Sequence, residues 1–141
     1  MKLKNCKYTQ IEEEFYGKKV IIFGLGDFFQ YYVKEHLPES IWENVAYIVD
    51  SKPTCNSIYV KDREYAVKRV DEIKSESDGI ILITSSNYMF EMYEQLSKME
   101  LPDSIFCYCY GLIMAGSSGK DDPLIIKEFS DNSRKMRIPK I

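Results

Sequence analysis

The chain has 141 residues, of which 45% are hydrophobic and 29% are charged, and its formal net charge at pH 7 is −3. This length and composition predict one soluble globular domain that buries a core without disulfide bonds. An acidic balance without a long basic run argues against a nucleic-acid partner, and no apolar run has the length of a membrane span. We therefore expect a cytoplasmic protein whose four cysteines are reduced thiols.

The first segment, residues 1–17, predicts a short helix. Thr9 and Glu12 have the spacing of a capping box, and Gly17 suits the position just after a helix end. We expect this helix to precede the first strand of the fold.

The next segment joins a strand, a tight turn and a helix. Val20–Phe23 is apolar on both faces, as in a central parallel strand that helices cover on each side. Gly24 and Gly26 follow, and apolar residues then recur at helical spacing as far as Leu37, before Pro38. This order is that of a first βα unit.

Further strands and helices alternate along the chain. Buried-type strands are predicted at 45–50, 80–84 and 104–110, with a short strand at 57–60. Helices are predicted at 63–73 and after the capping residues at 85–87. Alternation at this spacing predicts an α/β fold, a Rossmann-like, doubly wound and mainly parallel sheet in three layers. We assign 18–115 to this domain and 116–141 to a loop and linker that lead to a further domain.

The glycine turn is the first candidate binding site. Gly24 and Gly26 match the first two glycines of the dinucleotide fingerprint, but Phe29 stands where that fingerprint has a third glycine or alanine. Such a ring either pushes the helix outward or lies over the site. Backbone N–H groups near Gly26, Asp27 and Phe28 would face a phosphate. The alternative is a tight βα turn that binds nothing.

Polar residues at two other strand ends complete the candidate site. Asp50, followed by Ser51, ends the second strand, where such folds place the acid that binds a ribose 2′-hydroxyl. Ser85 and Ser86 end the third main strand, beside the expected ligand crevice. The alternatives are a turn aspartate that binds its own backbone and serines that cap the next helix.

No catalytic or metal-binding group is expected in this chain. Cys107 and Cys109 share a strand face without further ligands nearby in sequence, so buried inert thiols are the better interpretation. His36, the one histidine, falls near a helix end, where a cation suits the helix dipole. Residues 116–120 lack the spacing of a phosphate-binding Walker A loop.

The chain also resembles a known group of domains. Residues 22–26, 47–50 and 81–86 resemble the small Rossmann-like nucleotide-binding domains of bacterial sugar and polysaccharide biosynthesis proteins. Met136–Ile141 resembles the opening of the first strand of glycosyltransferases that carry a DXD motif. The resemblance implies an N-terminal module of such a glycosyltransferase, with the sugar-transfer chemistry in a following domain.

The leading hypothesis is a binding module without catalytic residues that accommodates NAD, another nucleotide or a nucleotide-sugar. A second hypothesis is a ligand-free structural module that forms homo-oligomers, because Phe28, Phe29, Tyr31 and Tyr32 give an aromatic surplus. The third is a fragment of an NAD-dependent sugar oxidoreductase.

Overall fold

The structure is a computed structural model that describes residues 1–115. Its strands are β1 (Lys2–Lys4), β2 (Val20–Phe23), β3 (Val45–Asp50), β4 (Ser57–Val60), β5 (Arg63–Arg69), β6 (Gly79–Ile83) and β7 (Ile105–Cys109). Its helices are α1 (Ile11–Phe15), α2 (Lys34–His36), α3 (Glu39–Trp42), α4 (Met89–Ser97) and α5 (Tyr110–Met114). Shorter turns of 3-10 helix form η1 (Tyr8–Gln10) and η3 (Val70–Ser75), and a π-helical segment forms η2 (Phe29–Val33).

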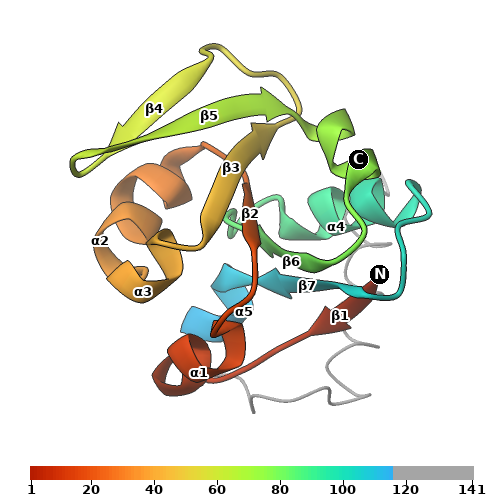
Figure 1. Ribbon diagram of the computed structural model, residues 1–141, viewed down its shortest axis with the longest axis horizontal. Helices are drawn as coiled ribbons and strands as arrows, with labels where there is room; N and C mark the ends of the chain where they lie inside the picture. Colours follow the sequence, from red (N-terminus) through yellow and green to blue (C-terminus); the bar gives the residue numbers. More distant parts are fainter. Residues whose placement is uncertain (116–141) are drawn as a thin grey trace, which may run out of the picture.

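The strands form one seven-stranded sheet in the order β1-β7-β6-β2-β3-β5-β4 within the described residues (Figure 1). Neighbouring strands are parallel except for β4 and β5, which form an antiparallel hairpin at one edge. The central position of β2, between β6 and β3, is that of the first strand in a doubly wound nucleotide-binding fold. The Rossmann-like, mainly parallel fold predicted from the sequence is confirmed.

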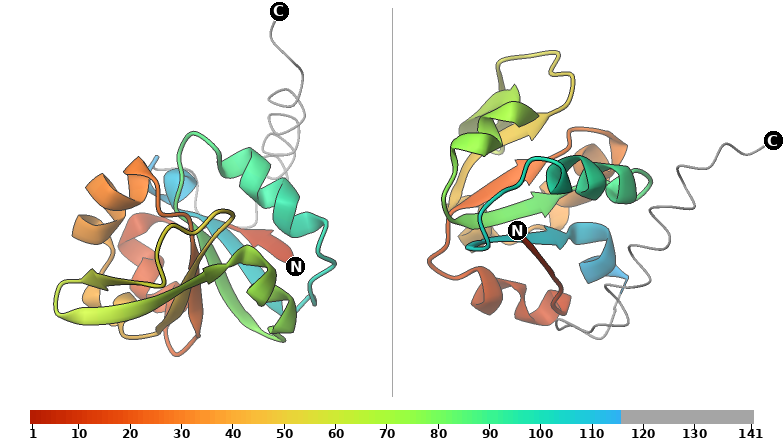
Figure 2. Two further views of the ribbon diagram at one scale, coloured as in Figure 1. Left: turned by 90° about the horizontal axis from the view of Figure 1, so that it is seen from above. Right: turned by 90° about the vertical axis from the view of Figure 1, so that its right-hand side faces the viewer.

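The two faces of the sheet bury separate apolar clusters, and β2 contributes to both. Val20 and Ile22 pack on the face covered by α1, α2, α3 and α5, while Ile21 and Phe23 pack on the face covered by η3 and α4 (Figure 2). All four β2 side chains are at most 1% exposed. Because side chains alternate across a strand, an apolar run without polar interruptions is what a strand covered on both faces requires.

The N-terminal segment holds a strand that the sequence analysis does not predict. β1 pairs in parallel with β7 at the sheet edge, and α1 follows within the expected range. Gly17 has φ +71° directly after the helix end, as predicted. The predicted capping box is wrong, because Gln10 occupies the N-cap and makes no capping side-chain bond.

The helix predicted at 63–73 is wrong, although the strand at 57–60 is confirmed as β4. Residues 63–66 pair antiparallel with β4, around a turn in which Lys61 has φ +55°, and residues 67–69 pair in parallel with β3. Tyr65 and Val67 are buried while their neighbours are exposed, which is the period of two that belongs to a strand. Only the later apolar residues of the predicted helix, Val70 and Ile73, lie on a helical turn, η3.

Within residues 1–115, no helix combines the length and apolar character that a membrane crossing requires. The predicted loop and linker at 116–141 lie outside the described residues.

A part-buried carboxylate ties the sheet to the turn before β6. The Glu76 carboxylate pairs with the Lys19 ammonium and accepts a hydrogen bond of 2.9 Å from the Tyr47 hydroxyl. Burial alone would raise the pKa of Glu76, but bonding to Lys19 and Tyr47 outweighs burial and holds the pKa below its usual value. Ionised Glu76 is therefore more favourable in the folded chain than in the unfolded chain.

We predict that Glu76→Gln lowers the free energy of unfolding at pH 7 by about 1–2 kcal/mol, the cost of losing hydrogen bonds to a charged group. The contribution of Glu76 is present above the ordinary glutamate pKa of about 4.3 and is lost as pH falls through the lower folded-state pKa, so the difference between the two proteins should shrink as pH falls below this ordinary value. Urea unfolding at pH 7 and at pH 3.5 measures this. An equal difference at both values would contradict the assignment.

Candidate functional site

The turn after β2 requires glycine at its first position. Gly24 has φ +125°, a conformation that residues with a side chain rarely adopt. A Cβ atom there would lie 3.1 Å from both the Met92 Cε atom of α4 and the Thr84 Oγ1 atom after β6. Gly24 therefore lets the turn pack tightly against the chain that leaves β6.

Both neighbouring strands hold this turn in place. The Gly24 N–H donates to the Val49 carbonyl oxygen of β3 at 3.0 Å. On the other side, the buried Thr84 hydroxyl lies 2.7 Å from the Gly24 carbonyl oxygen and 3.0 Å from that of Phe23. Sequence reasoning missed the role of Thr84; the available signal was a hydroxyl residue at the end of an otherwise apolar strand.

Gly26 begins the helix that follows the turn. Its carbonyl oxygen accepts from the Gln30 N–H at 3.1 Å, and helical residues continue from 27 to 36. A Cβ atom on Gly26 would meet nothing within 4 Å, so the space above this residue is open. The first N–H groups of a helix have no partner within the helix, and the positive end of the helix dipole lies there. The turn therefore presents donors to an open space.

The Asp50 carboxylate connects the end of β3 with the glycine turn. Its Oδ2 atom accepts from the Leu25 N–H at 3.2 Å, and its Oδ1 atom accepts from the Lys52 N–H at 2.9 Å. The bond to Lys52 is the local turn bond that the alternative interpretation predicts, and the bond to Leu25 adds a link to the turn. Each carboxylate oxygen has a second lone pair, so both oxygens can still accept a hydrogen bond.

The candidate serines make local bonds in the structure. The Ser85 Oγ atom accepts from the Tyr88 N–H at 3.1 Å, in the turn before α4. The Ser51 hydroxyl donates to Gln95 Oε1 of α4 at 3.1 Å. Ser51 therefore connects β3 to α4, whereas Ser85 shapes the loop after β6.

A pocket of about 230 Å³ lies between the start of the 27–36 helix and the loop after β6. Five candidate residues line it, Gly26, Asp27, Phe28, Ser85 and Ser86, while Gly24, Asp50 and Ser51 lie outside its lining. Its other lining residues are Tyr31, Tyr32, Thr84, Asn87 and Tyr88. The helices after β2 and β6 cover opposite faces of the sheet, so this pocket lies at the topological switch point.

The Phe29 ring does not cover this pocket. It is fully buried and packs edge-on against Trp42 of α3, with ring centroids 6.2 Å apart. Of the two alternatives for Phe29, a ring over the site is therefore wrong, because the helix turns this residue toward the core. Phe29 also begins the π-helical segment η2, and such segments occur often at functional sites.

The other residues considered for chemistry are buried or make local contacts in the structure. Cys107 and Cys109 are fully buried free thiols, and burial beside Cys107 raises the pKa of the Cys109 thiol, as expected of inert groups. The His36 Nδ1 atom lies 2.9 Å from the Tyr32 carbonyl oxygen near the end of its helix. In residues 1–115, histidine, cysteine and acidic side chains form no group that could hold a metal ion.

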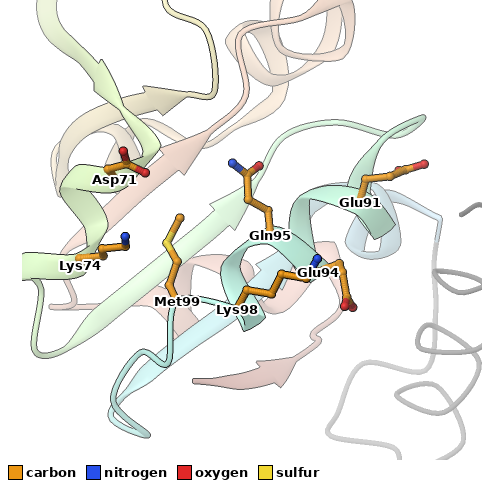
Figure 3. Close-up of a pocket in the computed structure, with 7 residues that line it drawn as sticks. All are labelled: Asp71, Lys74, Glu91, Glu94, Gln95, Lys98 and Met99. Carbon is orange, nitrogen blue, oxygen red and sulfur yellow. The ribbon is translucent and has the colours of Figure 1, made fainter.

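A larger groove of about 420 Å³ lies between η3 and α4 (Figure 3). Asp71 and Lys74 line it from η3, and Glu94 of α4 and Lys98 directly after that helix line it from the other side, so both walls carry acidic and basic side chains. Glu91, also on α4, points away from the other side chains. The lining of the groove includes no residue of the glycine turn, and its mixed charge favours no particular ligand.

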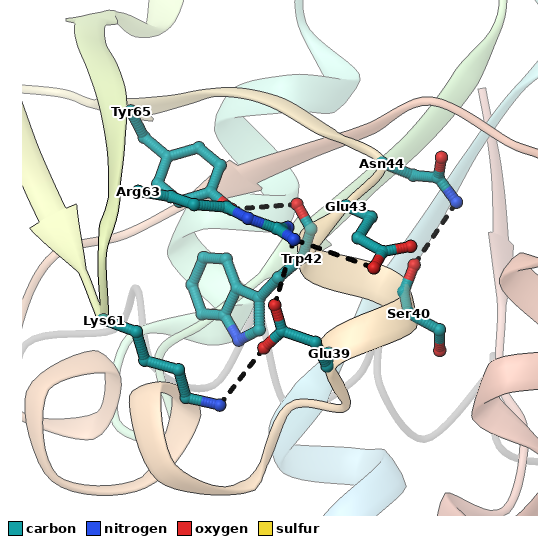
Figure 4. A network of polar contacts seen from close by, with 8 residues as sticks. All are labelled: Glu39, Ser40, Trp42, Glu43, Asn44, Lys61, Arg63 and Tyr65. Carbon is teal, nitrogen blue, oxygen red and sulfur yellow. Dashed lines mark hydrogen bonds and ion pairs between the residues drawn. The ribbon is translucent and has the colours of Figure 1, made fainter.

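A third cavity, of about 280 Å³, is lined by residues of α3 and of the β4–β5 hairpin. Three of its charged side chains are paired, as Figure 4 shows: the Glu39 carboxylate lies 3.2 Å from the Lys61 Nζ atom and 3.2 Å from the Arg63 Nη2 atom. The Arg63 Nη2 atom also lies 3.6 Å from the Glu43 carboxylate. The Tyr65 hydroxyl donates to the Trp42 carbonyl oxygen at 2.9 Å. These contacts fasten the hairpin to α3, which is a structural role.

No protein-family model and no curated protein sequence matches the chain. Among solved structures, it is similar to RSP, described as a Rex-family repressor, with 16% identity, a TM-score of 0.46 and coverage of 91% of this chain and 65% of that chain. RSP in complex with beta-NADH matches at 15% identity and TM-score 0.44, covering 84% and 62% of the two chains. The complex of RSP with beta-NAD+ and operator DNA matches at 16% identity and a TM-score of 0.46, and the match covers 84% of this chain and 58% of that chain. The chain thus spans about three fifths of these proteins, and the fold assignment depends on its own strand order.

The two glycines of the turn should respond differently to a methyl group. Gly24→Ala is expected to lower the free energy of unfolding by about 1–3 kcal/mol, because the positive φ and the tight contacts with Met92 and Thr84 strain the turn. Gly26→Ala is the matched control and should change stability by less than about 1 kcal/mol, since its Cβ meets nothing. Chemical denaturation measures both. Equal losses would contradict this description of the turn.

Proposed function

We propose that the chain binds a nucleotide with an unphosphorylated ribose, of the NAD class, across the carboxyl ends of β2, β3 and β6. The observation that carries the proposal is the bond between Leu25 N–H and Asp50 Oδ2, which places the strand-terminal acid directly beside the glycine turn. A phosphate donor set, a ribose acceptor and an open pocket thus come together at the switch point.

The phosphates would lie over Gly26. The missing side chain leaves room for them. The N–H groups of the first helical turn and the positive end of the helix dipole lie at this end of the helix, where an anion is favoured. The pocket lining contains no lysine or arginine, so backbone donors supply the attraction in the described part of the chain. Such a site suits a pyrophosphate better than a more highly charged triphosphate.

The ribose next to these phosphates would bond to Asp50. A carboxylate accepts hydrogen bonds from ribose hydroxyls, and the free lone pairs on its two oxygens leave it able to do so. The same negative charge repels a 2′-phosphate. The site should therefore select NAD over NADP.

We further propose, from the sequence resemblance, that this module belongs to a polysaccharide-biosynthesis protein of the glycosyltransferase class. On this view 18–115 is the binding domain, 116–141 leads to a transferase domain, and a nucleotide-sugar is the alternative ligand. The Met136–Ile141 segment that suggests this lies outside the described residues. The absence of catalytic residues from this chain, its cytoplasmic location and the absence of a nucleic-acid partner remain predictions.

The binding proposal is tested by calorimetric titration of the full chain with NAD, NADP and UDP-glucose. We expect NAD to bind at least tenfold more tightly than NADP, because the Asp50 charge opposes the 2′-phosphate. Gly26→Ala, which should leave folding intact, is expected to weaken NAD binding at least tenfold by filling the phosphate position. A folded protein that gives no heat with any of these nucleotides would refute the proposal.

A ligand-free assembly module is the second candidate, and exposed aromatic side chains favour it. Tyr31 and Tyr32 are 71% and 51% exposed, whereas Phe29 is buried and cannot contribute to an interface. If these rings form a subunit contact, the chain should sediment as a dimer or larger species, and the double substitution Tyr31→Ser, Tyr32→Ser should convert it to a monomer. Analytical ultracentrifugation that shows a monomer up to high micromolar concentration would exclude this candidate.

A further inference from the structure

The pocket beside the glycine turn has an unusual lining for a nucleotide site. Four of its lining residues are aromatic, Phe28, Tyr31, Tyr32 and Tyr88, and Asp27 is the one charged residue among them. Backbone donors near Gly26 serve the phosphates at one end of this pocket, and the rest of its lining offers no basic side chain. The lining instead suits a flat ring that is neutral or positively charged.

The aromatic residues approach the pocket from two walls. Tyr31 and Tyr32 belong to the helix after β2, and Tyr88 belongs to the loop after β6. Phe28 and Tyr32 pack against each other with ring centroids 5.5 Å apart, and Phe28 also contacts Tyr110 of α5 at 6.0 Å. These contacts fix the inner part of the wall.

Tyr31 and Tyr88 form the outer part and are left open to solvent, at 71% and 65% exposure. Large exposed rings beside a pocket offer stacking surface to a planar ligand, and each such stack is worth about 1–3 kcal/mol. The ring of a bound ligand would therefore gain contacts that the free protein does not make.

The position of Asp50 decides which half of a dinucleotide reaches this pocket. Asp50 ends β3 on one side of β2, and the aromatic pocket lies toward β6 on the other side. A dinucleotide with its pyrophosphate over Gly26 and its first ribose at Asp50 must place its second half in the aromatic pocket. In NAD that half carries the nicotinamide ring.

We propose that the aromatic pocket binds the nicotinamide ring and prefers its oxidised, positively charged form, an inference that depends on the proposed nucleotide-binding function. The oxidised ring is a cation, attracted by the Asp27 carboxylate and by the faces of the tyrosine rings. The reduced ring is neutral and gains only the stacking contribution. The module therefore distinguishes NAD+ from NADH.

Titration of the full chain with ADP-ribose, NAD+ and NADH tests this selectivity, because ADP-ribose keeps both riboses and the pyrophosphate but lacks the nicotinamide. NAD+ is expected to bind about fivefold more tightly than NADH, because a partly exposed cation–π contact changes affinity by about this factor. Asp27→Asn should bring the ratio of the NADH and NAD+ dissociation constants close to one. Any effect of the substitution on phosphate binding cancels in this ratio, because both ligands carry the same phosphates.

Substitution of the outer ring gives the second readout. Tyr88→Ala should weaken NAD+ binding about fivefold and leave ADP-ribose binding unchanged. Tyr59→Ala is the matched control, since Tyr59 is also 65% exposed but lies on edge strand β4.

The outcomes separate the two proposals. A folded chain that binds neither ADP-ribose nor NAD+ refutes the proposed function and the inference with it. Binding of ADP-ribose without a preference for NAD+ over NADH overturns the inference alone. So does a Tyr88→Ala protein that loses ADP-ribose and NAD+ affinity equally.

Discussion

The close packing of the β2 turn against the end of β6 is the constraint on which the candidate site depends. A Cβ atom on Gly24 would lie 3.1 Å from both the Thr84 Oγ1 atom and the Met92 Cε atom, so even a methyl group disturbs the junction. The Thr84 hydroxyl donates to the Gly24 carbonyl oxygen from the β6 side. The Val49 carbonyl oxygen accepts from the Gly24 N–H on the β3 side. Three neighbouring strands thereby fix the direction in which the helix at 27–36 leaves the sheet.

This fixed direction explains why the binding groups meet. The turn brings Leu25 N–H to Asp50 and leaves Gly26 open above the first turn of the helix. The loop after β6 then forms the opposite wall of the pocket. A small change in the turn would move the phosphate donors relative to the ribose acceptor, so the same glycine serves both stability and geometry.

The sequence predicts the central strands well because they are buried on both faces. Val20–Phe23 and Val45–Asp50 are apolar runs bounded by turn residues, and the structure gives them the same bounds. The segment 63–69 could not be assigned from helical spacing, since pairing with β4 and β3 decides its conformation. β1 was missed because its three residues are too few to show the alternation of apolar and polar side chains, and because the strand depends on pairing with β7.

For the site, motif spacing predicts the turn but not the directions of its side chains. Phe29 interrupts the glycine fingerprint, yet its ring turns into the core against Trp42 and leaves the pocket open. The aromatic wall combines the helix after β2 with Tyr88, a residue far along the chain, so only the fold brings these rings together.

The central claim is that a nucleotide binds over the glycine turn, and amide chemical shifts of the isotope-labelled full chain during titration with ADP-ribose test it most directly. The account predicts saturable shifts at Leu25, Gly26, Asp27 and Phe28, together with residues next to Asp50. Shifts confined to the groove between η3 and α4, or no shifts at millimolar ligand, would contradict it.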